Sequence, residues 1–230
     1  MTIEKRLMIC FILLILSIQF IFAQQNNSLM WNTIQVPFQI SKKWQIHNDI
    51  SHRFLISSGT SYQYTIRTGI RRIFNKKWNA ASGVALFYTR TSMEKANHEF
   101  GREFRLWQEV VNEKKINKKL NLVNRLRFDE RFFAATSARE AVYATRFRLR
   151  IALIQTLSEK WKLQIANEYM QQLTHKTFSF QQNRLGAAGI YVFNSSTQLQ
   201  AGYIWSKLPT STLHYVTCTF IKTLHSKWIQ

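Results

Sequence analysis

The chain has 230 residues and carries 32 lysine and arginine residues against 12 acidic residues, which gives a formal net charge of +20 at pH 7. Hydrophobic residues make up 46% and aromatic residues 14% of the chain, which excludes a disordered or low-complexity protein. The strong positive charge favours an anionic partner, such as a nucleic acid or a membrane surface.

The first residues have the layout of a secretory signal. Lys5 and Arg6 precede a mostly apolar run from Leu7 to Phe22, and polar residues follow Ala23. We expect residues 1–23 to be a signal peptide and residues 24–230 to form one domain, with an N-terminal membrane anchor as the alternative. Export argues against a nucleic-acid partner and favours membrane lipid, lipopolysaccharide or a small acidic ligand.

After residue 23 the chain alternates between apolar and polar residues at a period of two, which is typical of β-strands. In the segment that begins at Trp44, for example, Ile46, Ile50 and Phe54 share one parity, and Asp49 lies on the other. Eleven such segments begin, in chain order, near Trp31, Trp44, Tyr62, Ala80, Phe100, Leu120, Ala144, Trp161, Gln182, Gln198 and Thr212. Short, mostly basic connections alternate with slightly longer ones, as in an up-and-down meander.

Charged residues occupy the polar parity of several central segments. In the stretch LNLVNRLRFDERFF, from Leu120 to Phe133, arginine or aspartate stands at every second position from Arg125 to Arg131. The candidate interior charge network consists of Glu103, Arg105, Glu109, Arg125, Arg127, Asp129, Arg131, Arg146, Arg148, Arg150, Glu168 and Arg184. Glu130 has the opposite parity, so we expect it near a rim or beside a β-bulge.

Two architectures share this alternation: a soluble β-sandwich or barrel with its apolar face inward, and a membrane barrel with its apolar face outward. The long segments, the aromatic residues at their ends and the export signal favour the membrane barrel. We therefore predict an all-β, up-and-down antiparallel transmembrane β-barrel of ten to twelve strands. Because bacterial barrels have even strand numbers, we favour twelve.

Several runs resemble an uncharacterised β-barrel family of Gram-negative outer membranes, domain of unknown function 2490. They are EFRLWQ at Glu103–Gln108, RLRFDERF at Arg125–Phe132, TRFRLR at Thr145–Arg150, NEYM at Asn167–Met170 and FQQNR at Phe180–Arg184. The resemblance implies an outer-membrane location. It supplies no activity and no catalytic residues.

The chain offers no metal-ligand spacing and no glycine-rich phosphate loop, so we expect no cofactor and no metal. We predict a monomeric, non-enzymatic barrel with a mostly filled, charged lumen that acts structurally, as a small pore or in ligand binding. One alternative is a lipid-modifying barrel enzyme, which requires a serine and a histidine that meet near a rim. Another is a secreted soluble β-protein that binds an acidic ligand.

Overall fold

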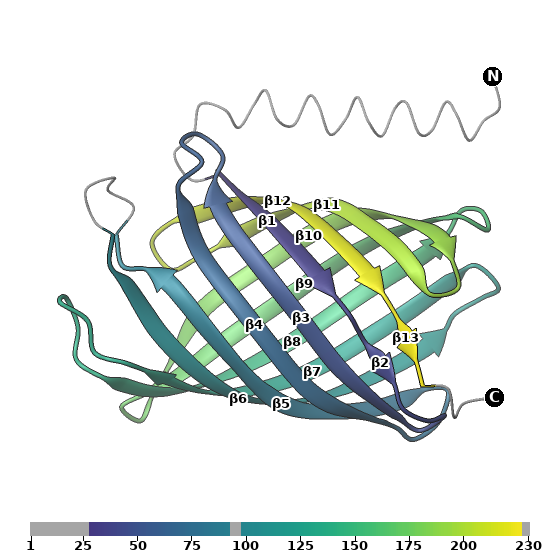
Figure 1. The fold of residues 1–230 in the computed structure, drawn as a ribbon, viewed down its shortest axis with the longest axis horizontal. Coiled ribbons are helices and arrows are strands. Elements are labelled where there is room, and N and C mark those ends of the chain that lie inside the picture. Colours follow the sequence, from purple (N-terminus) through teal and green to yellow (C-terminus); the bar gives the residue numbers. More distant parts are fainter. Residues whose placement is uncertain (1–27, 93–97, 227–230) are drawn as a thin grey trace.

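In the computed structural model, which describes residues 28–92 and 98–226, the chain forms a closed β-barrel (Figure 1). The predicted all-β barrel is confirmed. The signal peptide expected at residues 1–23 lies outside the described residues. Within the described ranges, no helix is long and apolar enough to cross a membrane.

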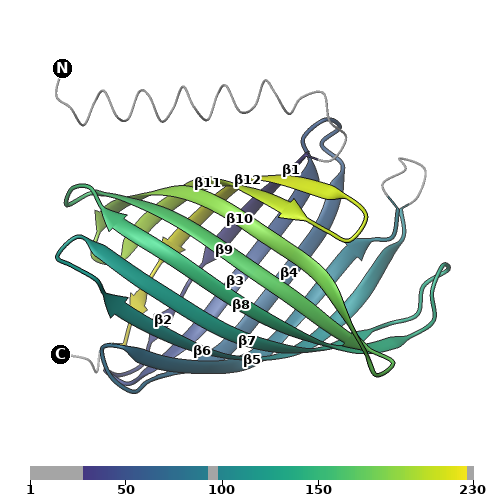
Figure 2. The same cartoon turned by 180° about the vertical axis from the view of Figure 1, so that it is seen from behind.

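Thirteen strands are present in the described residues. They are β1 (Ser28–Gln35), β2 (Phe38–Gln39), β3 (Trp44–Leu55), β4 (Ser61–Ile73), β5 (Trp78–Arg90), β6 (Phe100–Lys115), β7 (Leu120–Phe133), β8 (Val142–Thr156), β9 (Trp161–Thr174), β10 (Thr177–Asn194), β11 (Thr197–Lys207), β12 (Thr212–Lys222) and β13 (Leu224–His225). Each strand from β3 to β11 pairs antiparallel with the next one along the chain, which is the predicted meander (Figure 2).

The barrel closes where β1 joins the meander at both of its ends. β1 pairs antiparallel with β3 and parallel with β12. The closed barrel of the described chain therefore has eleven strands, β1 and β3 to β12, and one parallel pairing. A closed barrel with an odd number of strands that alternate in direction requires one parallel pairing, because its first and last strands run in the same direction.

The strand number of twelve that we favoured is not observed, although eleven lies within the predicted range. The described residues before Trp31 belong to β1, and Phe220 is followed by the last two residues of β12 and by the two-residue strand β13. Pro37, which has no backbone N–H, separates β1 from β2. Across the seam, Leu224 of β13 donates a backbone hydrogen bond to the Pro37 carbonyl at 2.8 Å.

The two ends of the barrel differ in their connections. The lysine-rich end consists of the turns at residues 40–43, 74–77, 116–119, 157–160 and 195–196. The loop end consists of the connections at residues 56–60, 91–99, 134–141, 175–176 and 208–211. The connection after β9 is a two-residue turn in which His175 and Lys176 both have positive φ.

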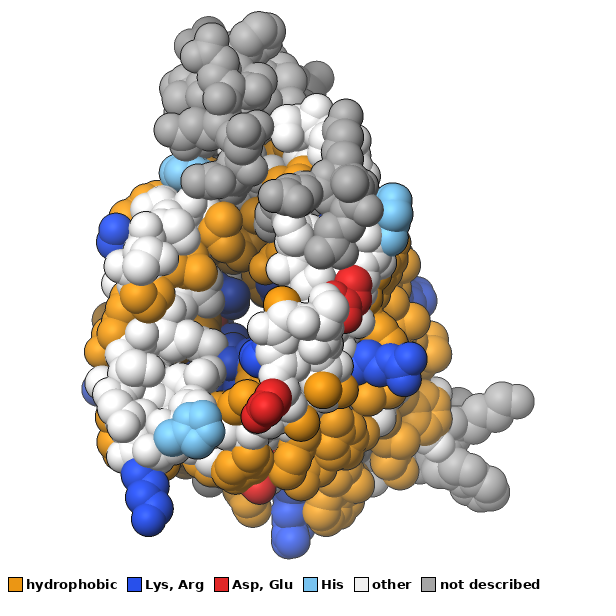
Figure 3. Space-filling model, turned by 90° about the vertical axis from the view of Figure 1, so that its left-hand side faces the viewer, with side chains coloured by type: hydrophobic (Ala, Val, Ile, Leu, Met, Phe, Trp, Pro, Cys, Tyr) orange, Lys and Arg blue, Asp and Glu red, His pale blue; other side chains and the backbone are white. Residues whose placement is uncertain are grey.

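The two faces of the wall carry the residues that the alternation assigns to them. Ile50 and Leu126 lie on the outer face and are 61% and 60% exposed. Asp129 and Glu168 lie on the inner face and are 2% and 7% exposed. Figure 3, which looks onto the loop end, shows hydrophobic side chains over the outer wall and lysine or arginine side chains inside the opening.

An aromatic side chain fills one side of the interior. Trp107 of β6 is 1% exposed and lies over Gly69 of β4 and Gly83 of β5, which face each other across the β4–β5 pair. A Cβ atom at either glycine would overlap the indole ring. The indole N–H donates a hydrogen bond to the Val84 carbonyl at 3.2 Å, so this buried donor is satisfied.

Candidate functional site: the charged lumen

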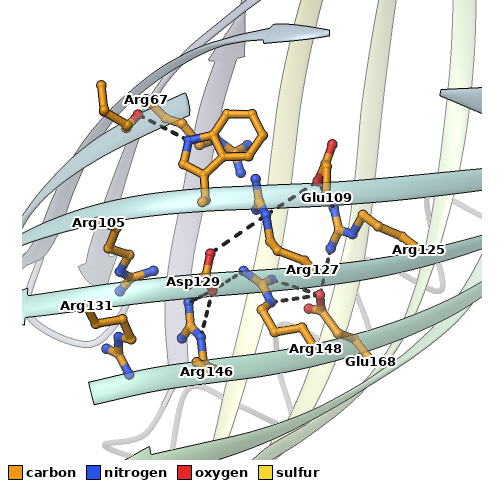
Figure 4. A network of polar contacts seen from close by, with 12 residues as sticks. Arg67, Arg105, Glu109, Arg125, Arg127, Asp129, Arg131, Arg146, Arg148 and Glu168 are labelled. Carbon is orange, nitrogen blue, oxygen red and sulfur yellow. Dashed lines mark hydrogen bonds and ion pairs between the residues drawn. The ribbon is translucent and has the colours of Figure 1, made fainter. Parts of the chain in front are cut away.

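The structure places all twelve residues of the candidate charge network on the inner face of β6 to β10. Their side chains lie inside the barrel, where arginines surround a smaller number of carboxylates (Figure 4). Counted over the described chain, the inner face carries eleven arginines and five carboxylates. The arginines are Arg53, Arg67, Arg71, Arg105, Arg125, Arg127, Arg131, Arg146, Arg148, Arg150 and Arg184, and the carboxylates are Asp49, Glu103, Glu109, Asp129 and Glu168.

Asp129 on β7 is the centre of one group of contacts. Arg146 lies directly opposite on β8 and donates two hydrogen bonds to Asp129 Oδ2, from Nη2 at 2.7 Å and from Nε at 2.9 Å. Arg148 Nη1 lies 3.6 Å from the same oxygen, and Arg127 Nε lies 3.8 Å from Oδ1. One carboxylate therefore stabilises three guanidinium groups.

Glu103 on β6 is a second centre, nearer the loop end. It accepts hydrogen bonds from Arg105 on its own strand and from Arg131 Nε on β7 at 2.6 Å. Arg131 Nη1 also donates to Gln172 of β9 at 2.6 Å. Arg105 lies 3.4 Å over the ring of Phe87, so its charge is held between a carboxylate and an aromatic face.

Glu109 and Glu168 connect the remaining arginines toward the lysine-rich end. Glu168 Oε1 accepts from Arg125 Nη2 at 2.6 Å and from Arg148 Nη2 at 2.8 Å, and its other oxygen lies 3.7 Å from Arg184 Nη1. Glu109 contacts Arg127 Nε at 3.4 Å. The carboxylates therefore bridge β6 to β10 in a continuous network.

Four members of the wider network are absent from the twelve-residue candidate network: His47, Asp49, Arg67 and Arg71. His47 Nε2 lies 2.7 Å from Asp49 Oδ2, and Arg67 Nη2 lies 2.6 Å from the same oxygen. Arg71 Nη2 lies 3.2 Å from Glu109 Oε1. The polar parity of these residues on β3 and β4 could have predicted their place on the inner face. However, β3 and β4 lack the dense run of arginines that marks β7 and β8.

Two interior arginines have no ion pair or hydrogen bond among the described residues: Arg53 and Arg150. Arg53 is 9% exposed, and it stacks on Trp31 with its guanidinium carbon 3.7 Å from the ring centre. Such a contact contributes on the order of 0.5 to 2 kcal/mol. Burial of an unpaired ion costs several kcal/mol, so the stacking does not offset the loss of water.

The lumen is filled on one side only. Trp107 and the charged network occupy the β6–β9 side, and a cavity of about 530 Å³ lies beside them. Its wall on β12 extends from Leu213 near the loop end to Ile221 near the lysine-rich end. Uncharged or small side chains line its open side, namely Gln35, Gly186, Ala188, Gln200, Thr217 and Thr219. These side chains are too short or too few to fill the interior.

One serine and one histidine meet near the loop end, on the outer face. His52 Nε2 lies 3.1 Å from Ser61 Oγ, and the Tyr64 hydroxyl donates to the same oxygen at 2.8 Å. Asn32 of β1 faces His52 across the β1–β3 pair. His47, which contacts Asp49 at 2.7 Å, lies in the lumen instead. In the described ranges, no group of three histidine, cysteine or acidic side chains could hold a metal ion.

A family model described as "Protein of unknown function (DUF2490)" matches residues 29–216, from the second residue of β1 into β12. The chain belongs to the DUF2490 family. The predicted resemblance is thereby confirmed over nearly the whole barrel. No curated protein matches the chain. The DUF2490 description states no activity, so the roles of the interior residues must be argued from their geometry.

Proposed function

We propose that this DUF2490 protein is an outer-membrane β-barrel whose lumen admits small anions. The observation that carries the proposal is the excess of six guanidinium groups over carboxylates beside a cavity that follows the wall from one end to the other. An excess of fixed positive charge in a narrow, partly desolvated channel concentrates anions and repels cations.

The outer surface supports the membrane location. Ile34, Ile66 and Ile165 are each at least 50% exposed on the outer face of different strands. Soluble monomers rarely expose continuous apolar surface of more than a few hundred Å². Aromatic residues lie at both edges of this surface, with Trp44 and Trp78 at the lysine-rich end, as in the aromatic girdles of membrane barrels.

The closed wall and the basic turns suggest the partners. Each of the eleven barrel strands is paired on both sides within the described chain, so no open edge is left for a second copy, and we propose a monomer. At the lysine-rich end, Lys42, Lys43, Lys76, Lys77, Lys118 and Lys119 lie in exposed turns. They would contact phosphate groups of membrane lipid or lipopolysaccharide, and each lysine near an anionic surface contributes about 1 kcal/mol.

The test is ion conduction by the purified protein in planar lipid bilayers. We expect stable conductance and a reversal potential that favours chloride over potassium in a KCl gradient. Arg150→Gln should reduce this preference without leaving a carboxylate unpaired, because Arg150 makes no ion pair in the described chain. The matched control is Arg102→Gln, which removes an exposed arginine from the outer face. A protein that stays soluble without detergent, or that never conducts, would contradict the proposal.

The contact between His52 and Ser61 favours a second candidate, hydrolysis of lipid esters at the loop-end rim. Ser61 Oγ would attack the acyl carbonyl carbon, and His52 would take the hydroxyl proton and pass it to the departing alcohol. Water would then hydrolyse the acylated serine. Release of fatty acid from phospholipid vesicles tests this activity, with Ser61→Ala as the inactive variant and Ser58→Ala, in the neighbouring loop, as the control. Equal release by both variants, or none by the parent protein, removes this candidate.

A further inference from the structure

An apolar and aromatic cluster lies inside the barrel near the loop end, beside the parallel seam. Leu29 of β1, Leu55 of β3 and Tyr215 of β12 form its buried centre, and Trp31 packs against it. The rings of Trp31 and Tyr215 meet edge to face with their centres 5.7 Å apart. These two rings form a fixed platform on the wall of the cavity, and both residues line the cavity.

Two arginines converge on this platform from different strands. The guanidinium carbon of Arg53 lies 3.7 Å from the Trp31 ring centre and 5.5 Å from that of Tyr215. The corresponding distances for Arg184 of β10 are 5.5 and 5.9 Å. Two like charges are thus held close to the same pair of rings, although guanidinium groups repel each other.

The carboxylates of the lumen leave this pair of arginines largely uncompensated. Arg53 has no carboxylate partner in the described chain, and Arg184 reaches only Glu168, at 3.7 Å. Glu168 already accepts shorter contacts from Arg125 and Arg148. The Nε atoms of Arg53 and Arg184 and the indole Nε1 of Trp31 are buried without an acceptor. Three unsatisfied donors in one place are rare in a folded protein and indicate a missing acceptor.

We propose that Arg53 and Arg184 bind the carboxylate or phosphate group of a small hydroxylated organic anion, a sugar acid or a sugar phosphate. Guanidinium groups match the geometry of both oxyanions and bind them with paired hydrogen bonds. The rest of the ligand would extend into the cavity, whose volume of about 530 Å³ is ordinary for a small-molecule site. There the amides and hydroxyls of Gln200, Thr217 and Thr219 are available to sugar hydroxyls.

This inference rests on the proposed anion-admitting lumen and deepens it, because it assigns the selective contact to one position. It also separates two kinds of interior arginine. Arg131 and Arg146 hold strands together through carboxylates, whereas Arg53 and Arg184 are held over aromatic rings and keep their donors for a ligand.

The experiment is isothermal titration calorimetry of the full chain, folded in detergent micelles, with glucuronate, glucose 6-phosphate and neutral glucose. We expect both anions to bind, and glucose to bind at least about tenfold more weakly, because a charged hydrogen-bonded contact contributes that much or more. Arg53→Gln and Arg184→Gln should each weaken binding of the anions about tenfold or more.

The matched control is Arg71→Gln, which also removes one positive charge from the lumen but lies near the lysine-rich end, beside Gln45 and Glu109. Because charge effects at a distance are screened, this variant should change anion binding less than about threefold. Equal losses in all three variants would overturn the site in favour of a diffuse electrostatic effect, and absence of anion binding to the parent protein would also overturn it. Anion-selective conductance that persists without such binding would leave the pore proposal standing, so the two failures are distinguishable.

Discussion

Asp129 and Arg146 face each other across β7 and β8, and Arg146 donates two hydrogen bonds to one oxygen of Asp129, Oδ2, at 2.7 and 2.9 Å. Asp129 also lies 3.8 Å from Arg127 Nε on its own strand and 3.6 Å from Arg148 Nη1 on the adjacent strand. Its removal would leave Arg146 without a carboxylate partner and would take one of two carboxylates away from Arg127 and from Arg148.

Asp129→Asn is therefore expected to lower the free energy of unfolding by about 3 to 5 kcal/mol, the usual cost of breaking a buried ion pair from one side. The measurement is urea unfolding of the protein in lipid vesicles, followed by tryptophan fluorescence. Glu130→Gln is the control, because the Glu130 side chain lies on the outer face, where it accepts a 3.5 Å hydrogen bond from the Tyr143 hydroxyl. If both variants lowered the free energy of unfolding by a similar amount, the interior ion pairs of Asp129 would not be the cause of its contribution to stability.

Gly69 and Gly83 provide the space that Trp107 occupies. Gly69→Ala should destabilise the barrel by about 1 to 3 kcal/mol or more, because the new methyl group would overlap the indole ring and a carbonyl oxygen of the facing strand. Thermal unfolding in micelles would measure the change. Gly101→Ala is the matched control, since the nearest atom to its added Cβ would be the Thr136 methyl group at 3.3 Å, which leaves much more room than the indole ring does at Gly69. If both substitutions are equally tolerated, Trp107 does not pack as described.

The outer face offers a direct test of what surrounds the barrel. Leu149 lies near the middle of β8 and is 46% exposed, and Leu157 lies in the following turn and is 50% exposed. If lipid surrounds the barrel, Leu149→Arg should lower the free energy of unfolding by about 2 to 4 kcal/mol and Leu157→Arg by about 0 to 1 kcal/mol. Urea unfolding in vesicles provides the comparison. Two small and equal effects would fit a barrel surrounded by water.

Glu99 connects two loops at the loop end. The Ser137 hydroxyl and backbone N–H, the latter at 2.8 Å, donate hydrogen bonds to its carboxylate and hold the pKa of Glu99 below its ordinary value of 4.5. A lowered pKa in the folded state means that this contact stabilises the fold fully above pH 4.5. The stabilisation is lost as the pH falls through the folded-state pKa.

The amide resonance of Ser137 should therefore shift on acidification with a midpoint below 4.5, and Glu99→Gln should abolish the shift. Nuclear magnetic resonance of the labelled protein in micelles would follow it. The backbone fold should be unaffected, because Glu99 lies in a loop outside the strands. A midpoint at or above 4.5 would mean that the two hydrogen bonds do not persist in solution.

The alternating pattern was sufficient to predict the strands and to assign each side chain to one face of the wall. This holds because side chains on a strand point to opposite faces in turn, whatever lies around the strand. From this parity alone, Arg127 and Asp129 were expected together on the inner face, and Leu126 and Phe128 on the other. Glu130 was expected near a rim or a bulge, and the β7–β8 register runs past it without a shift.

The way the barrel closes could not be read from the pattern. Parity does not record how many strands surround the axis or which strand meets β1, because both depend on contacts between residues far apart in the chain. Only the tertiary structure decided that β1 lies parallel to β12. That seam brings Trp31 and Tyr215 together and places Arg53 and Arg184 over the same two rings. The tertiary structure likewise decides which arginines pair with carboxylates. The pairing depends on distances across the lumen, and the spacing of residues along one strand does not determine those distances.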